Sequence, residues 1–222
     1  MNCLSQIVTD NIQTQQVYPT RLEKLRNDWK RYLNPNPNPV LTISQQYRLE
    51  LTEMMYLKSI QEDRTLFHLS LTYKPFEDRI YRESDVNRFF TTFYIQHLLP
   101  KLLGTKRIQK RRSVQPICLA FVDENILQPW KVTPSRVTNE QLKTPYFPAR
   151  LHHHAILAVH PSTVNHMHNL IGLNTFASGD FTNKIMTSDL KECEAMRLLY
   201  ASKMLKKYPD FLSFPDRMST VH

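Results

Sequence analysis

The sequence predicts an α+β fold, a ferredoxin-like or split βαβ antiparallel sheet with an N-terminal helical appendage. Short runs in which apolar and polar residues alternate indicate strands, and longer runs with apolar residues at helical spacing indicate helices. From residue 65 onward these patterns follow the order strand, helix, strand, strand, helix, strand, helix, as in a split βαβ sheet. Such a fold places helices on one face of the sheet and leaves the other face open for chemistry.

Residues 1–64 are expected to form the appendage. The segment Thr20–Leu33 has the pattern of a basic helix, and the NPNPNP run over Asn34–Pro39 ends it, because proline lacks an N–H and restricts the preceding residue. This run is the predicted linker. A second helix is expected over Ser44–Ser59, with apolar side chains at i, i+4, i+7 and i+8 spacing.

Residues 65–222 are expected to form the larger domain. Its first strand is Thr65–Tyr73, and the helix after it has Ser84 as the expected N-cap and extends toward Pro100 and Gly104. The remaining expected elements are two strands, a short helix, a strand and a final helix: Ile117–Val122, Arg150–Val159, Ser162–Leu170, Phe181–Thr187 and Asp189–Lys207.

Composition excludes several classes of protein. A chain of 222 residues with 41% hydrophobic residues can bury a core, and no apolar run is long enough for a membrane span. Three glycines permit neither a GxGxxG fingerprint nor a Walker-type P-loop, which excludes Rossmann cofactor binding and P-loop ATPases. Three scattered cysteines and the absence of a signal peptide favour a cytoplasmic location and no membrane partner.

The charge balance points to a polyanionic partner. The formal net charge is +9, and positive charge gathers after the first long helix of the larger domain. Such clusters neutralise phosphates and give salt-dependent affinity for nucleic acid. The expected nucleic-acid-binding residues are Lys106, Arg107, Lys110, Arg111, Arg112 and, near the C-terminus, Lys207.

Three consecutive histidines lie in the strand expected over residues 150–159. Side chains alternate between the faces of a strand, so His152 and His154 share one face while His153 lies on the other. Two neutral imidazoles on one face can bind one divalent cation. The alternative is that they are ordinary packed or surface histidines.

The expected final helix carries the second chemical feature. On an ideal helix Tyr200, Lys203 and Lys207 share one face, opposite an apolar Ala/Leu side. A phenol is a poor nucleophile, but neighbouring cations favour the phenolate and neutralise charge that develops on a phosphate under attack. The alternative is a surface tyrosine beside solvated lysines.

Together these features resemble the HUH endonuclease superfamily, in particular its rolling-circle replication initiators. The resemblance rests on FHLSLTY, LHHHAIL and YASKMLKKY, and it covers residues 65–208. It implies that His152 and His154 bind Mg²⁺ or Mn²⁺, that Tyr200 is the nucleophile and that Lys203 positions charge. The implied activity is nicking and joining of single-stranded DNA at a plasmid or phage origin through a 5′-phosphotyrosine, with a helicase and a polymerase supplied by the host.

The resemblance leaves several points open. His153 replaces the family's usual bulky hydrophobe and would need a polar partner in the helix-packed layer. Many members take a third ligand from a neighbouring strand, and the candidates are Asp123, Glu124 and Glu140. Tyr208 is a candidate second nucleophile. The competing functions are a single-strand transposase, a relaxase, and a non-catalytic ferredoxin-like protein that binds nucleic acid.

Overall fold

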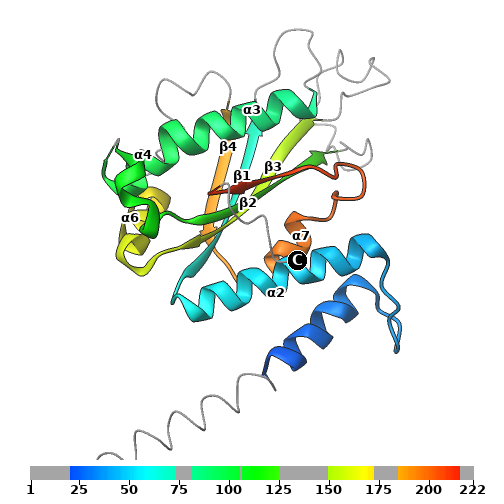
Figure 1. Ribbon diagram of the computed structural model, residues 1–222. Helices are drawn as coiled ribbons and strands as arrows, with labels where there is room; N and C mark the ends of the chain where they lie inside the picture. The colour runs from blue at the N-terminus through cyan, green and yellow to red at the C-terminus, as the bar shows by residue number, and fades with distance from the viewer. Residues whose placement is uncertain (1–20, 74–81, 106, 126–149, 173–184, 216–222) are drawn as a thin grey trace, which may run out of the picture.

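The computed structural model describes residues 21–73, 82–105, 107–125, 150–172 and 185–215, and these build an α+β fold around one antiparallel sheet (Figure 1). The sheet has five strands in the order β4-β1-β3-β2-β5. Their bounds are Thr65–Tyr73 for β1, Ile117–Asn125 for β2, Arg150–Val159 for β3, Ile185–Glu192 for β4 and Phe211–Phe214 for β5.

Strand β3 occupies the centre of the sheet and pairs with β1 on one side and β2 on the other. Its alternating side chains divide the core into two clusters of buried residues. Ala155, Leu157 and Val159 belong to the cluster on the face of α3 (Glu83–Phe93). Ile156 and Ala158 belong to the opposite cluster, and they share that face with His152 and His154.

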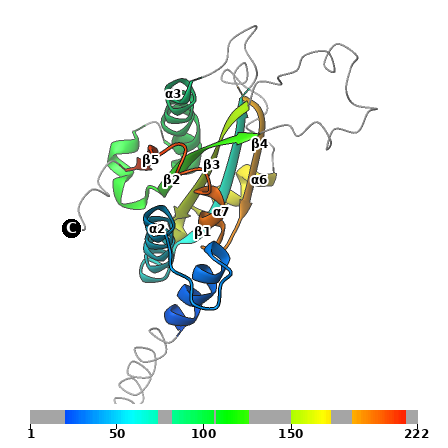
Figure 2. The same ribbon diagram turned by 90° about the vertical axis from the view of Figure 1, so that its right-hand side faces the viewer.

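Helices cover both faces of the sheet, so the expected open face is not present. Figures 1 and 2 show α3 and α4 (Leu99–Leu103) on one side and α2 (Ile43–Gln61) with α7 (Arg197–Ala201) on the other. The expectation was wrong because apolar residues of the N-terminal segment bury themselves against the sheet. These residues are Trp29, Leu49, Leu51 and Met55.

The N-terminal segment contains the two expected helices, over residues 21–33 and Ile43–Gln61. Thr42 begins α2 with a capping box, since its side chain accepts a hydrogen bond from the N–H of Gln45 and its own N–H donates to the Gln45 side chain. Residues of α2 and of the sheet contribute to one buried cluster. The domain boundary expected after residue 64 stays a prediction.

The predicted strands over 65–73 and 150–159 are confirmed residue for residue. The predicted helix after residue 84 begins slightly earlier, with Arg82 as its N-cap, and continues through a π-helical turn (Tyr94–Leu98) into α4. Gly104, at φ +64°, ends that path in the left-handed conformation that glycine favours. Helix α6 (Pro161–Gly172) follows β3 as expected.

The predicted final helix over residues 189–207 is wrong. Residues up to Glu192 continue β4, because their backbones pair with β1 and this tertiary pairing overrides the local helical pattern. The helix that does form is short, Arg197–Ala201, and is followed by turns. Strand β5 was not expected at all. None of the helices in the described ranges is long and apolar enough to cross a membrane.

Arg48 of α2 ties the N-terminal segment to α7. Its guanidinium donates hydrogen bonds to the carbonyl oxygen of Leu199 and, at 3.2 Å, to Oγ of Ser202. Burial lowers the pKa of Arg48, and an arginine guanidinium stays protonated in proteins. The last carbonyl groups of a helix have no following helical N–H groups to accept from. In the short helix α7, the carbonyl oxygen of Leu199 accepts from the charged Arg48.

We expect Arg48→Met to lower the free energy of unfolding by about 1 to 3 kcal/mol, because it leaves a partly buried carbonyl and hydroxyl without their donor. Urea denaturation followed by circular dichroism measures the change. Arg31→Met, which removes an exposed arginine from the first helix, is the matched control and should change the value little. Equal effects of the two substitutions would contradict the assigned role of Arg48.

Candidate metal centre

Three potential metal ligands meet on the face of the sheet that α7 covers. Asp123 of β2 lies directly opposite His152 of β3 in the strand register, and His154 follows His152 on the same face. All three side chains are buried. Strand pairing and side-chain alternation thus bring a carboxylate and two imidazoles together from segments far apart in the sequence.

The distances within the group suit the coordination of one ion. Nε2 of His152 and Nε2 of His154 are 3.1 Å apart, and Oδ2 of Asp123 lies 3.4 Å and 3.0 Å from them respectively. Two ligand atoms that each lie about 2.1 Å from one ion are separated by about 3.0 to 3.4 Å in octahedral or tetrahedral geometry. The group could therefore hold a metal ion, although these ligand types suit several metals.

Asp123 and His154 have the protonation states that metal ligands require. Burial alone would raise the pKa of Asp123, but hydrogen bonds from His152, His154 and Lys203 outweigh it and hold the pKa well below its ordinary value. Burial lowers the pKa of His154, and Asp123 only partly offsets this effect. A carboxylate and a neutral imidazole are the forms that bind a cation.

Tyr200 and Lys203 lie beside this group. Nζ of Lys203 is 2.7 Å from Oδ2 of Asp123 and 3.4 Å from the hydroxyl of Tyr200, so one ammonium group contacts both. The ring of Tyr200 packs edge-on against His154 with centroids 5.2 Å apart. Burial would lower the pKa of Lys203, but Asp123 raises it, so the ammonium form is retained.

Two cations flank the ring of Tyr200. The guanidinium carbon of Arg197 lies 4.4 Å from the ring centroid, and Nζ of Lys203 lies 4.5 Å from it. Arg197 was not among the expected site residues, although its position three residues before Tyr200 places it one helical turn away. The phenol thus lies between positive charge and the buried ligand group.

Lys207, Glu124 and Tyr208 form a separate group. Glu124 follows Asp123 in β2 and therefore points to the other face, where Lys207 forms an ion pair with it. The hydroxyl of Tyr208 donates to Oε2 of Glu124 at 3.1 Å, and burial together with this carboxylate raises the pKa of Tyr208. Lys207 does not share a face with Tyr200, because the helix ends before it.

Of the three acidic candidates for a third ligand, the structure brings Asp123 into the histidine group and places Glu124 outside it. Glu140 lies outside the described residues. Sequence reasoning left this choice open because Asp123 and Glu124 are adjacent, and only the register of β2 against β3 decides which of them faces the histidines.

His153 lies on the opposite face, as alternation predicted, and it has the polar partners that its position requires. The hydroxyl of Tyr73 is 2.8 Å from Nδ1, and Oδ1 of Asn87 is 2.9 Å from Nε2. Burial, and then the charges of the neighbouring histidines, lowers the pKa of His153 to about 3. The ring is therefore neutral at physiological pH and accepts from Tyr73 while donating to Asn87.

The basic cluster lies away from this centre. Arg107, Lys110, Arg111 and Arg112 are exposed on and beside the 3₁₀ helix Ile108–Val114, which leads into the start of β2. Asp123 is near the other end of that strand, six residues after Ile117, which at about 3.4 Å per residue is about 20 Å along the strand. Lys106 lies outside the described residues.

His68 is a buried polar residue that was not among the expected site residues. It lies on β1, and its Nε2 is 3.1 Å from Nδ1 of His154. The sequence indicates the face on which His68 lies, because alternation along the strand puts it opposite Phe67 and Leu69. The register that aligns it with the histidines of β3 is a tertiary feature.

Comparison of the chain with known protein families, with curated proteins and with solved structures finds no match.

We expect Asp123→Asn to weaken Mn²⁺ binding at least about 10-fold, because it removes the anionic ligand of the group. Electron paramagnetic resonance of free and bound Mn²⁺ measures the dissociation constant. Glu124→Gln makes the same change of charge one residue away and is the control, for which we expect little change. A comparable loss in both variants would assign the effect to general electrostatics.

His153 should make stability depend on pH. Its folded pKa, about 3, lies below the ordinary value of 6.5, so the unfolded chain binds the proton more readily. The contribution of neutral His153 to the free energy of unfolding is complete above about pH 6.5. It falls as the pH is lowered toward 3, by up to about 1.4 kcal/mol per pH unit. Urea denaturation from pH 7 to pH 4 should show a smaller slope in His153→Gln than in the wild type; parallel curves would contradict the assignment.

Proposed function

We propose that this protein is a metal-dependent nicking and joining enzyme for single-stranded DNA, of the HUH type, that initiates rolling-circle replication of a plasmid or phage. The observation that carries the proposal is the position of Tyr200. A tyrosine hydroxyl, a lysine and a buried Asp-His-His group are linked by contacts of 3.4 Å or less through Lys203. This arrangement combines a nucleophile, positive charge and candidate metal ligands in one place.

Each residue has a chemical role in this proposal. His152, His154 and Asp123 would hold Mg²⁺ or Mn²⁺, which supplies Lewis-acid polarisation of the scissile phosphate. Lys203 keeps its positive charge beside the hydroxyl of Tyr200 and offsets the charge of the phosphate under attack. Arg197, against the ring of Tyr200, adds a second positive charge beside the phenol and helps to orient it.

The reaction is a transesterification that needs no further reactant. The phenolic oxygen of Tyr200 bonds to phosphorus, and the bond from phosphorus to the 3′ oxygen breaks. The net proton transfer is from the phenol to the leaving 3′ oxygen, so the products are a 5′-phosphotyrosine and a free 3′ hydroxyl. Attack by a 3′ hydroxyl on this intermediate reverses the step and joins strands.

The order of elements supports the proposed HUH architecture. The succession β1, α3, β2, β3, α6, β4 follows the β-α-β-β-α-β scheme of the ferredoxin-like fold. The three segments that resemble family motifs lie on β1, on β3 and on α7 with the turn after it. The candidate third ligand is an aspartate from β2, whereas relaxases usually show a third histidine, and this difference supports an initiator.

Charge supports a nucleic-acid partner. The chain carries a net charge of +9, and four exposed cations lie together near the 3₁₀ helix. Their position at the end of β2 away from Asp123 suits contact with the phosphate backbone at a distance from the cleaved bond. In this proposal, strand separation and synthesis fall to a helicase and a polymerase of the host.

We expect Tyr200→Phe to abolish the covalent adduct between the protein and a single-stranded oligonucleotide in Mn²⁺, because the variant lacks the attacking oxygen. Denaturing gel electrophoresis detects the adduct, and fluorescence anisotropy should show DNA binding that is nearly unchanged. Tyr208→Phe is the matched control and should still form adduct, since Tyr208 donates to Glu124 outside the group. An adduct that persists in Tyr200→Phe would place the nucleophile elsewhere.

Lys203→Met should slow adduct formation by about 10- to 1,000-fold while leaving the nucleophile in place, because it removes charge stabilisation from the transition state. Single-turnover rates in excess protein measure the effect. Lys206→Met, which removes an exposed lysine from the same turn, should stay within about 2-fold of the wild type. If both variants slow the reaction equally, Lys203 contributes only to general DNA attraction.

A further inference from the structure

His68 is a buried histidine in contact with the candidate metal ligands. It lies on β1 with 1% of its surface exposed. In the strand register it is opposite Ile156, so it is a diagonal neighbour of His154 on the same face of the sheet. Burying an imidazole costs free energy unless the ring forms hydrogen bonds, so His68 needs a polar partner.

The contact between His68 and His154 is specific to one ring nitrogen. Nε2 of His68 lies 3.1 Å from Nδ1 of His154, and the two rings stack with centroids 5.1 Å apart and planes 28° from parallel. The other nitrogen of His154, Nε2, is directed at Asp123 and His152. The two nitrogens of His154 thus have different neighbours.

We propose that His68 is a positioning residue for the metal centre. When Nε2 of His154 offers its lone pair to a cation, the ring proton must reside on Nδ1. Nε2 of His68 accepts the hydrogen bond from that Nδ1–H. This bond selects the tautomer of His154 that can bind a metal, and the stacked ring fixes its orientation.

The contact between His68 and His154 matches the usual environment of a histidine that binds a metal. Histidine ligands ordinarily donate their second ring N–H to a carboxylate, a carbonyl or a water, and this partner contributes to metal affinity. Here a third imidazole takes that place on the neighbouring strand. Since His68 contacts the far side of His154 from Asp123, it acts through His154 and does not itself complete the ligand group.

This inference rests on the metal-binding part of the proposed function and is tested without DNA. We expect His68→Leu, which has no acceptor, to weaken Mn²⁺ binding about 10- to 100-fold by electron paramagnetic resonance titration. His68→Gln keeps an acceptor oxygen and should recover most of the affinity. His166→Leu removes an exposed histidine from α6 and controls for nonspecific binding by imidazoles.

Spectroscopy of the wild-type protein provides a second readout that does not depend on how the variants fold. With Mg²⁺ bound, a ¹⁵N–¹⁵N coupling across the hydrogen bond between Nδ1 of His154 and Nε2 of His68 is expected, with the proton on His154. A folded His68→Leu variant with unchanged Mn²⁺ affinity, or a Mg²⁺-bound protein with the proton on Nε2 of His154, would overturn the proposal. A failure of Tyr200 to form the DNA adduct would instead contradict the proposed function. It would not affect the conclusions drawn from the Mn²⁺ titration and the ¹⁵N–¹⁵N coupling.

Discussion

The side-chain alternation along β3 is the constraint on which the rest of the site depends. It sends His152 and His154 toward α7 and sends His153 into the core beneath α3. A shift of one residue in register would exchange the two sets and would place a carboxylate of β2 against the wrong ring. Because β3 is the central strand and pairs on both sides, that shift would disrupt both ladders at once.

Burial then sets the chemistry on each face. On one face, Asp123 remains ionised in a buried position because two imidazoles and the ammonium group of Lys203 surround it. On the other face, His153 remains neutral because burial, and then the charges of the neighbouring histidines, lowers its pKa, and its partners Tyr73 and Asn87 are uncharged. Neighbouring residues of one strand therefore have opposite electrostatic environments, which explains how three consecutive histidines divide between two roles.

Local patterns in the sequence were sufficient for the two strands that matter most, over residues 65–73 and 150–159, and for the faces on which the three histidines lie. They were not sufficient for the segment after residue 187. That segment has helical spacing, yet its first part pairs with β1, and pairing between distant strands leaves no local pattern. The choice of Asp123 over Glu124 and the proximity of His68 also depend on register, which one sequence does not fix.

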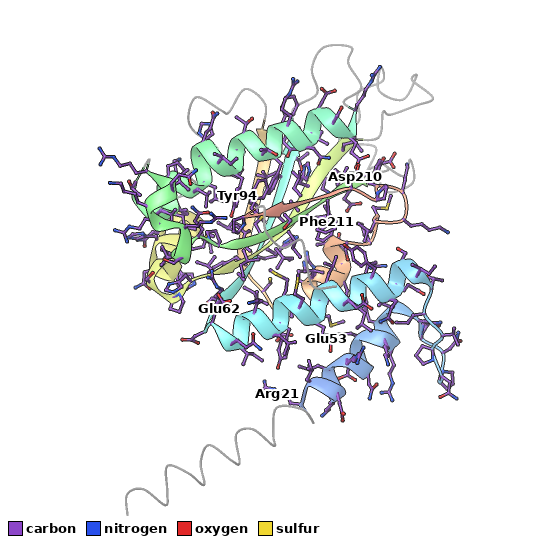
Figure 3. All side chains as sticks on the ribbon, viewed as in Figure 1. Arg21, Glu53, Glu62, Tyr94, Asp210 and Phe211 are labelled. Carbon is purple, nitrogen blue, oxygen red and sulfur yellow. The ribbon has the colours of Figure 1, made fainter. Side chains whose placement is uncertain are left out.

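The short helix α7 gives the N-terminal segment a direct connection to the site. A helix of five residues forms few internal hydrogen bonds and depends on tertiary contacts for its position. Arg48 of α2 supplies such contacts at Leu199 and Ser202, which flank Tyr200 and precede Lys203 (Figure 3 shows α2 running alongside α7). The position of Tyr200 beside His154 therefore depends on a segment that the sequence separates from it by about 150 residues. Because α7 contacts both α2 and the sheet, loss of the Arg48 contacts would remove one of the two supports of Tyr200 even with the sheet intact.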